Sequence, residues 1–239
     1  MTAQINNVIN NEESQMKKIL IALTNKATLG DTEEANGTYA PELTHALAVF
    51  LSAGYEYDFV SINGGIAPLY GTDIEDDAVN QKILVNEIFQ QRIKDTKKVE
   101  TINAADYDAI FYPGGFGLLS DLATHSEMAK ISATHYESNG IISAVCHGPA
   151  GLLPIQLSNG KSLLEDKKVT GFTREEEIDF GTINKIPFLL EESLARKAAQ
   201  FSKVQPWQVF VIEDNRVITG QNPASAHLVA QKVVNLLNK

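Results

Sequence analysis

Short hydrophobic runs alternate along this chain with segments whose apolar residues recur at helical spacing. Runs that are almost wholly apolar are typical of strands buried on both faces of a parallel sheet. The runs lie at residues 19–23, 57–61, 109–112 and 141–145, and helical periodicity marks residues 40–52, 76–91 and 121–138. This alternation predicts an α/β fold, with a flavodoxin-like, mostly parallel sheet and helices on both faces.

The later part of the chain continues the pattern with shorter elements. We expect a strand at 167–170, a helix at 191–201, a hairpin formed by 209–213 and 216–219, and a closing helix from Asn222-Pro223 to Leu237. Residues 17–239 are predicted to form one domain, in which residues 64–100 are a small helical insertion with a role as lid or subunit interface. The Asn- and Glu-rich residues 1–16 are predicted to form a flexible extension.

Composition narrows the function. Hydrophobic residues make up 44% and charged residues 21% of the 239 positions, as in globular proteins. A net charge of -10 disfavours nucleic acid, whose backbone needs clustered Lys and Arg. No apolar stretch is long enough to span a membrane, and the single cysteine, which cannot form an internal disulfide, fits a reducing compartment. We expect a cytoplasmic protein that acts on small molecules.

Cys146 is the first candidate for chemistry. The segment I-I-S-A-V-C-H-G joins a predicted strand to a glycine-containing helix start, which is the logic of a nucleophile elbow. A thiol at a helix N-terminus is expected to have a lowered pKa, because the helix dipole and free amides favour the thiolate. The alternative is that Cys146 is an inert core residue.

Two neighbouring features support the same site. His147 directly follows the cysteine and could transfer protons, although adjacent side chains on a sharp turn usually diverge, so it could instead only shape the turn. Gly114 and Gly115 follow the strand 109–112, at the sheet edge where α/β folds bind ligands, and their amides could stabilise an oxyanion. The alternative is a glycine turn without a ligand.

These segments together resemble the ThiJ/PfpI superfamily, within the class I glutamine-amidotransferase-like fold. The motifs that carry the resemblance are N-G-T-Y-A-P-E-L, P-G-G-F-G, A-V-C-H-G-P-A, V-T-G-F-T-R-E-E-E and V-I-T-G-Q-N-P-A-S-A-H, spread in this order over residues 17–239. The chain looks most like the branch of glutathione-independent glyoxalase III and heat-shock-chaperone-like proteins.

The resemblance implies roles for two acidic residues. Glu42 of A-P-E-L would stabilise the thiolate, and Glu177 would orient His147. The alternatives are an ordinary acidic residue in a helix's first turn and a solvated acidic helix start. Phe116 departs from the branch, because many relatives have histidine there. The other histidines are dispersed, so we expect no metal and no cofactor, and the resemblance implies a homodimer.

The expected function is therefore a cofactor-free glyoxalase III that converts 2-oxoaldehydes such as methylglyoxal to 2-hydroxy acids such as lactate. Cys146, His147 and Glu42 are the predicted catalytic residues, and Gly114, Gly115 and Glu177 are predicted to bind the oxyanion and substrate. Two alternatives use the same cysteine. One is a redox-sensing or chaperone-like stress protein without turnover, and the other is a cysteine-dependent amidase or peptidase.

Overall fold

A seven-stranded sheet forms the centre of the protein. The computed structural model describes residues 16–239, so the predicted extension at residues 1–16, apart from Met16, lies outside the described residues. The strand order is β10-β11-β7-β6-β1-β3-β5, and every neighbouring pair is parallel except β10 and β11. These strands are β1 (Lys18–Leu23), β3 (Glu56–Ser61), β5 (Lys97–Lys98), β6 (Ala109–Tyr112), β7 (Ile141–Val145), β10 (Val211–Asp214) and β11 (Val217–Gly220).

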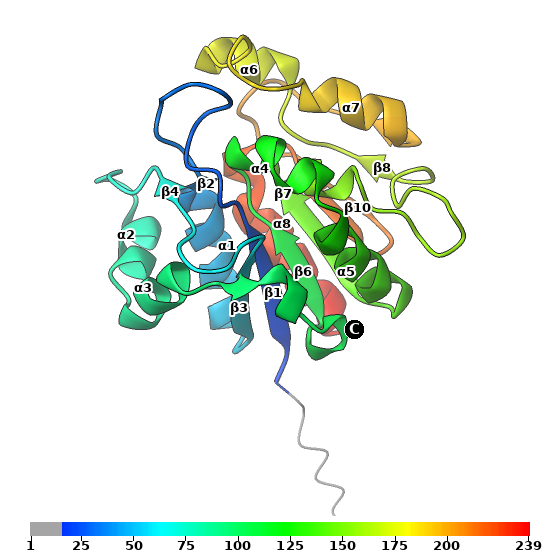
Figure 1. The fold of residues 1–239 in the computed structure, drawn as a ribbon, viewed down its shortest axis with the longest axis horizontal. Helices are drawn as coiled ribbons and strands as arrows, with labels where there is room; N and C mark the ends of the chain where they lie inside the picture. Colours follow the sequence, from blue (N-terminus) through cyan, green and yellow to red (C-terminus); the bar gives the residue numbers. More distant parts are fainter. Residues whose placement is uncertain (1–15) are drawn as a thin grey trace, which may run out of the picture.

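Helices cover both faces of the sheet, as the sequence pattern predicts (Figure 1). Helices α1 and α8 pack against each other on one face, and α5 lies on the other. The α-helices are α1 (Ala40–Ser52), α2 (Ala78–Leu84), α3 (Glu87–Lys94), α4 (Gly117–Ser120), α5 (Ser126–Glu137), α6 (Arg174–Phe180), α7 (Leu190–Lys197) and α8 (Ala226–Leu237). Short 3-10 helices lie at Val99–Thr101, Ala104–Asp106, Leu122–Thr124, Gly148–Leu152 and Pro223–Ser225.

The central strands are apolar because both of their faces are buried. In β1, Ile19 and Ile21 contact the core beneath α1 and α8, whereas Leu20 and Ala22 contact the core beneath α5. Successive side chains of a strand point to opposite faces, so an uninterrupted apolar run fills both cores. The parallel strands end at one edge of the sheet, which places Tyr112 and Val145 next to the segments that carry the candidate site.

The structure corrects four predicted elements. The predicted strand 167–170 is β8 (Lys168–Val169), which pairs with β9 (Gln200–Phe201) outside the main sheet, so the helix predicted to reach residue 201 ends at Lys197. The helix predicted over 121–138 begins only at Ser126, after a 3-10 turn. Within 64–100, the Asn86 side chain caps α3 and breaks the predicted helix in two. That segment also supplies β4 (Leu69–Tyr70), paired with β2 (Thr38–Tyr39), and the sheet strand β5.

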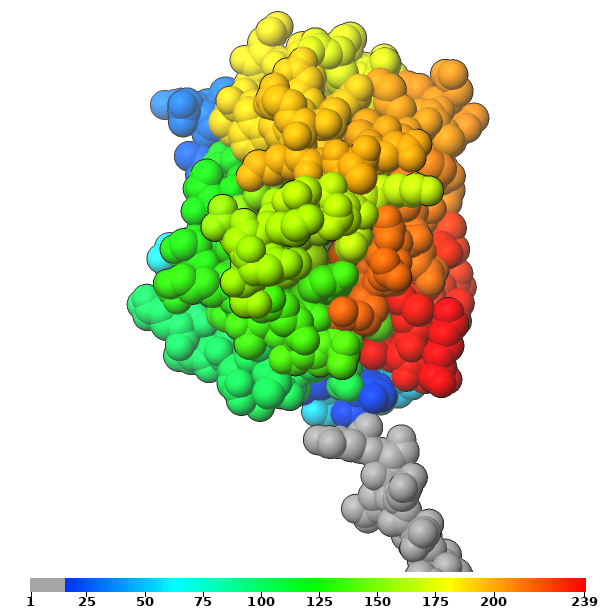
Figure 2. Space-filling model, turned by 90° about the vertical axis from the view of Figure 1, so that its right-hand side faces the viewer, coloured from blue at the N-terminus to red at the C-terminus, as the bar shows by residue number. Residues whose placement is uncertain are grey.

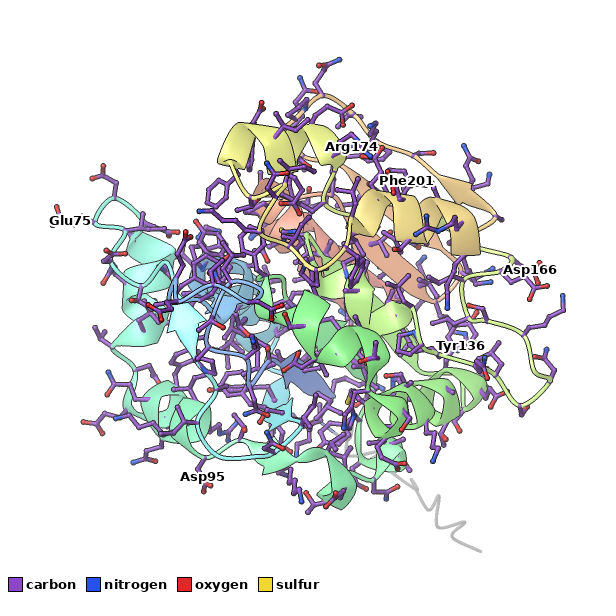
Figure 3. The ribbon with its side chains drawn as sticks, turned by 45° about the horizontal axis from the view of Figure 1, so that its top comes forward. Glu75, Asp95, Tyr136, Asp166, Arg174 and Phe201 are labelled. Carbon is purple, nitrogen blue, oxygen red and sulfur yellow. The ribbon has the colours of Figure 1, made fainter. Side chains whose placement is uncertain are left out.

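Helices α6 and α7 form a cap over the edge of the sheet where the parallel strands end (Figures 1 and 3). Figure 3 shows Arg174 at the start of α6, Phe201 in β9 beside the cap, and Glu75 at the left edge of the view, in the 64–100 segment. The yellow and orange residues in Figure 2 pack continuously over the green ones beneath them. No helix within residues 16–239 has the length and apolar character that crossing a bilayer requires.

We expect Phe50→Ala to lower the free energy of unfolding by about 3–5 kcal/mol, because removing a buried ring leaves a cavity. Phe50 has no exposed surface, and its ring meets the edge of Phe111 at a centroid distance of 5.9 Å. The adjacent Leu51 is 44% exposed, so Leu51→Ala is the matched control and should change stability little. Denaturant unfolding measures both, and equal losses for the two variants would contradict this view of the core.

Candidate active site

Cys146 occupies a sharp turn between β7 and a short 3-10 helix. Its φ is 59°, a left-handed conformation that is uncommon for a residue other than glycine. The turn is held on both sides, because the Cys146 amide donates to Gly220 and its carbonyl accepts from the Phe172 amide. The elbow expected from the sequence is thus present in the fold. Only 4% of the Cys146 surface is exposed, and that residue lines a cavity.

His147 contacts both the sulfur and a buried carboxylate. Its Nδ1 lies 3.5 Å from Cys146 Sγ, and its Nε2 lies 2.6 Å from Glu177 Oε1. Because an ionised carboxylate only accepts hydrogen bonds, Nε2 carries the proton in neutral His147 and Nδ1 presents its lone pair to the thiol. Thr182 Oγ1 donates to the other Glu177 oxygen. The turn therefore does not make the two adjacent side chains diverge.

Glu42 approaches the sulfur from the opposite side. It lies in the first turn of α1, is fully buried, and forms no hydrogen bond of normal geometry through either carboxyl oxygen to the residues described. Gly114 makes room for it: a Cβ at position 114 would lie 2.1 Å from Glu42 Oε2 and 2.7 Å from Cys146 Cβ. The glycine is thus required by the close packing of Glu42 on the elbow.

Burial controls the titration of this pair. It raises the pKa of Glu42 to about 8, and the Cys146 thiol and Gly114 amide offset only part of that rise. Burial also raises the pKa of the Cys146 thiol, and an ionised Glu42 raises it further. The lowered thiol pKa expected from a helix dipole is therefore not found: burial and the neighbouring glutamates raise the pKa of the thiol instead. At neutral pH Glu42 is therefore predominantly protonated.

Free backbone amides lie beside these groups. The amides of Gly115 and His147 donate to no acceptor within residues 16–239, and both belong to the loops that follow β6 and β7. Gly115 has a φ of 121°, and a Cβ there would lie 2.2 Å from the Gly37 carbonyl oxygen. Only glycine allows this loop to pack against the segment that leads into α1.

Three successive glutamates in α6 are used differently. Glu175 lies at the surface and pairs with Lys203. Glu176 is fully buried and accepts hydrogen bonds from the 173, 207, 221 and 222 positions. Only Glu177 reaches His147, and it is the residue to which the resemblance assigns the orienting role.

The cavity above the sulfur is narrow and mostly aromatic. Its volume is about 80 Å³, which suits a molecule of a few heavy atoms because one water needs roughly 10–15 Å³ on the same measure. Its walls, besides Glu42, Cys146 and His147, are Tyr39, Tyr70, Phe116, Phe172, Phe180, Trp207 and Pro223. The phenols of Tyr39 and Tyr70 have raised pKa values, chiefly from burial, so both stay neutral and can donate hydrogen bonds.

The sequence reasoning missed most of these walls. Tyr39 stood inside the quoted motif N-G-T-Y-A-P-E-L, and Trp207 is the only tryptophan, so both carried some signal. Tyr70 comes from a two-residue strand in the predicted insertion and carried none. Within residues 16–239, no three His, Cys, Asp or Glu side chains converge in a way that could hold a metal ion.

Comparison with known proteins places this geometry in a family. The family model described as DJ-1/PfpI family matches residues 34–236. The chain belongs to the DJ-1/PfpI family. Among its DJ-1/PfpI relatives, the glutathione-independent glyoxalase HSP31 of Saccharomyces cerevisiae is 34% identical over 239 aligned residues, which cover 92% of this chain and 98% of the relative.

Two solved structures agree with this DJ-1/PfpI assignment. Rapid Encystment Protein 24 KDa of Francisella tularensis superposes with a TM-score of 0.88 at 33% identity, covering 93% of this chain and 99% of that one. Glyoxalase III of Candida albicans superposes with a TM-score of 0.80 at 29% identity, and the match covers 92% of this chain and 97% of that one. The predicted α/β fold with a mostly parallel sheet is confirmed by these structures.

We expect Gly114→Ala to displace Glu42 from the sulfur, because the new methyl group would overlap both side chains. The variant should lose most reactivity of Cys146 toward an aldehyde while it keeps the native far-ultraviolet circular dichroism. Gly160→Ala is the control for an alanine introduced away from the site: a Cβ there meets no atom within 4 Å, and the strain that its φ of 81° imposes stays within an exposed loop. An alanine at position 114 that left Cys146 reactivity intact would show that Glu42 packing is unimportant.

Proposed function

We propose that this protein is a cofactor-free enzyme of the glyoxalase III type, which converts 2-oxoaldehydes such as methylglyoxal to 2-hydroxy acids such as lactate. The observation that carries the proposal is the position of Cys146 Sγ, at the floor of a small cavity and 3.5 Å from His147 Nδ1. The glyoxalase names of the similar proteins from S. cerevisiae and C. albicans support it.

The reaction begins with addition of sulfur to the aldehyde. As the S–C bond forms at carbon 1, His147 Nδ1 takes the thiol proton, and Glu177 stabilises the resulting imidazolium. The carbonyl oxygen becomes the hydroxyl of a hemithioacetal after it receives a proton. In this proposal the free amides of Gly115 and His147 stabilise negative charge on that oxygen.

The remaining steps move one proton between neighbouring carbons. Removal of the proton from carbon 1, with protonation of the oxygen on carbon 2, gives an enediol. Protonation of carbon 2 and loss of the proton from the hydroxyl on carbon 1 then give a 2-hydroxy thioester. Water then attacks the thioester and releases the 2-hydroxy acid and the thiol. Carbon 1 is oxidised while carbon 2 is reduced, so the overall change is the addition of one water molecule and needs no external oxidant or reductant.

Glu42 acts in its protonated form in this scheme. A neutral carboxyl can donate a hydrogen bond to the sulfur as it gains negative charge, whereas an ionised one would repel it. Because the pKa of Glu42 is raised to about 8, the useful form is the main one at neutral pH. Glu42 and Cys146 titrate as a pair, which enters the reaction with both protons: His147 takes the proton of the thiol, and Glu42 keeps its own.

The geometry favours this function over hydrolysis of amides or peptides, because the cavity of about 80 Å³ offers no open groove for a chain. A redox-sensing role would use the same thiol without turnover. Action in the cytoplasm and assembly as a homodimer are further proposals, which cell fractionation and light scattering test.

Cys146→Ala should abolish formation of lactate from methylglyoxal, with a loss of roughly 10⁴-fold or more, because the nucleophile is gone. An enzymatic assay of lactate measures the rate of its formation in both proteins. His227→Ala, which changes an exposed residue on α8, is the matched control. If wild type forms no lactate, or if the Cys146→Ala variant forms it equally fast, the proposal is wrong. A stable sulfinate after mild peroxide, without turnover, would point to the redox role.

The rate constant kcat/KM for methylglyoxal should fall as the pH rises through about 8, because Glu42 then ionises beside the sulfur. Glu42→Gln keeps a neutral donor of similar shape, so the variant should be slower at pH 7 but should lack this decline. Stopped assays of wild type and variant between pH 6 and 10 test the direction of this pH dependence. An identical alkaline decline in both proteins would assign it to another group.

A further inference from the structure

Five aromatic rings form a closed circuit around the entrance to the cavity. We call Phe116, His147, Phe172, Trp207 and Phe180 the aromatic collar. Successive ring centroids around it are separated by 4.4, 4.5, 5.7, 6.3 and 6.0 Å, the last distance closing the circuit from Phe180 back to Phe116. These five rings come from five separate segments of the chain, so their convergence is a property of the fold.

The collar has a buried side and an exposed side. Phe116 and Phe172 are each 3% exposed and flank His147 at the reacting end. Phe180 and Trp207 are 57% and 42% exposed, so they form the mouth. A substrate whose aldehyde carbon meets the sulfur has its other end in the space that these rings enclose.

Trp207 is held firmly in place at this mouth. Its φ is 65°, a left-handed conformation that a bulky residue adopts only when its surroundings impose it. Its amide donates to Glu176 Oε1 at 2.9 Å, and its indole Nε1 donates to Asp179 Oδ2 at 3.2 Å. Both acceptors lie on α6, the helix that ends at Phe180, so the two rings of the mouth are positioned as one unit.

The collar offers no partner to a polar substituent. Neither Lys nor Arg lines the cavity, and its polar groups lie at the reacting end, on Glu42, Cys146, His147 and two tyrosines. A hydroxyl among the rings would lose its hydrogen bonds to water without replacement. A phosphate would in addition lie near the carboxylate of Asp179, with no cation to balance it.

We propose that the aromatic collar makes this enzyme selective for 2-oxoaldehydes whose substituent on carbon 2 is apolar, with Trp207 and Phe180 as the specificity-determining residues. The inference rests on the proposed glyoxalase function and deepens it. Hydroxylated and phosphorylated 2-oxoaldehydes are then poor substrates, although their reacting carbonyl groups are identical.

A matched pair of substrates tests the selectivity. The compounds 2-oxobutanal and 3-hydroxy-2-oxopropanal differ only by a methyl group in place of a hydroxyl. We expect kcat/KM to favour 2-oxobutanal by roughly 100-fold, the usual discrimination of an apolar pocket against an added hydroxyl. A ratio near one, or a preference for the hydroxylated compound, would overturn the proposal while leaving the glyoxalase function intact.

Substitutions at the mouth test which residues set the ratio. Trp207→Ala and Phe180→Ala should each reduce the preference for 2-oxobutanal by about tenfold, because water can then solvate the hydroxyl. Ile178→Ala is the matched control, since Ile178 is 55% exposed on the same helix and does not line the cavity. If the ratio stays unchanged in both mouth variants, the assignment of these residues is wrong.

A binding measurement separates this inference from the proposed chemistry. Trp207 is the only tryptophan, so intrinsic fluorescence reports directly on the mouth. Titration of the Cys146→Ala variant with the two aldehydes should give a saturable change and a Kd at least tenfold lower for 2-oxobutanal. Equal Kd values, or no saturable change with 2-oxobutanal, would overturn the selectivity even if turnover is observed. Selective binding by the Cys146→Ala variant, combined with a wild-type protein that forms no lactate, would instead contradict the glyoxalase function alone.

Discussion

The left-handed turn at Cys146 is the constraint on which the site depends. A residue with a side chain stays in that conformation, at a cost of order 1–3 kcal/mol, only if its surroundings hold it there. Here the amide is bound by Gly220 at the end of β11 and the carbonyl by Phe172 beyond β8. The sheet and the segment that leads into the cap therefore hold the turn from two sides. In this conformation the sulfur faces His147 and Glu42.

Three carboxyl groups are buried around one thiol, and none of them pairs with Lys or Arg in the described part of the chain. Each is stabilised differently. Glu42 keeps its proton, Glu177 accepts a hydrogen bond from His147, and Glu176 accepts several hydrogen bonds from neutral donors. Because the environment differs within a few ångströms, residues of the same type can act as a proton donor, an orienting base and a structural anchor.

Local patterns in the sequence were sufficient to predict those parts of the fold and site whose backbone geometry a single segment determines. The strand and elbow around Cys146, and the glycines after β6, follow from a hydrophobic run that meets a glycine turn. The contact between His147 and the sulfur could not be predicted, because it depends on a φ that distant hydrogen bonds impose. Tyr70 was equally hidden, since short, irregular segments show no periodicity and reach the site only through tertiary packing. Trp207 stands out as the only tryptophan, but nothing in its local sequence places it at the site. The break at Asn86 and the short strand β9 were missed because capping and pairing override weak periodic patterns.

The wide separation of the collar along the chain affects how the protein is made. A ribosome delivers Cys146 well before Trp207, and Phe172 and Phe180 emerge between them. Until the last of these rings has been synthesised and docked, the collar cannot cover the thiol at the elbow. A nascent chain of this protein thus passes through a stage in which its one cysteine lacks that cover, and completion of the cap ends that stage.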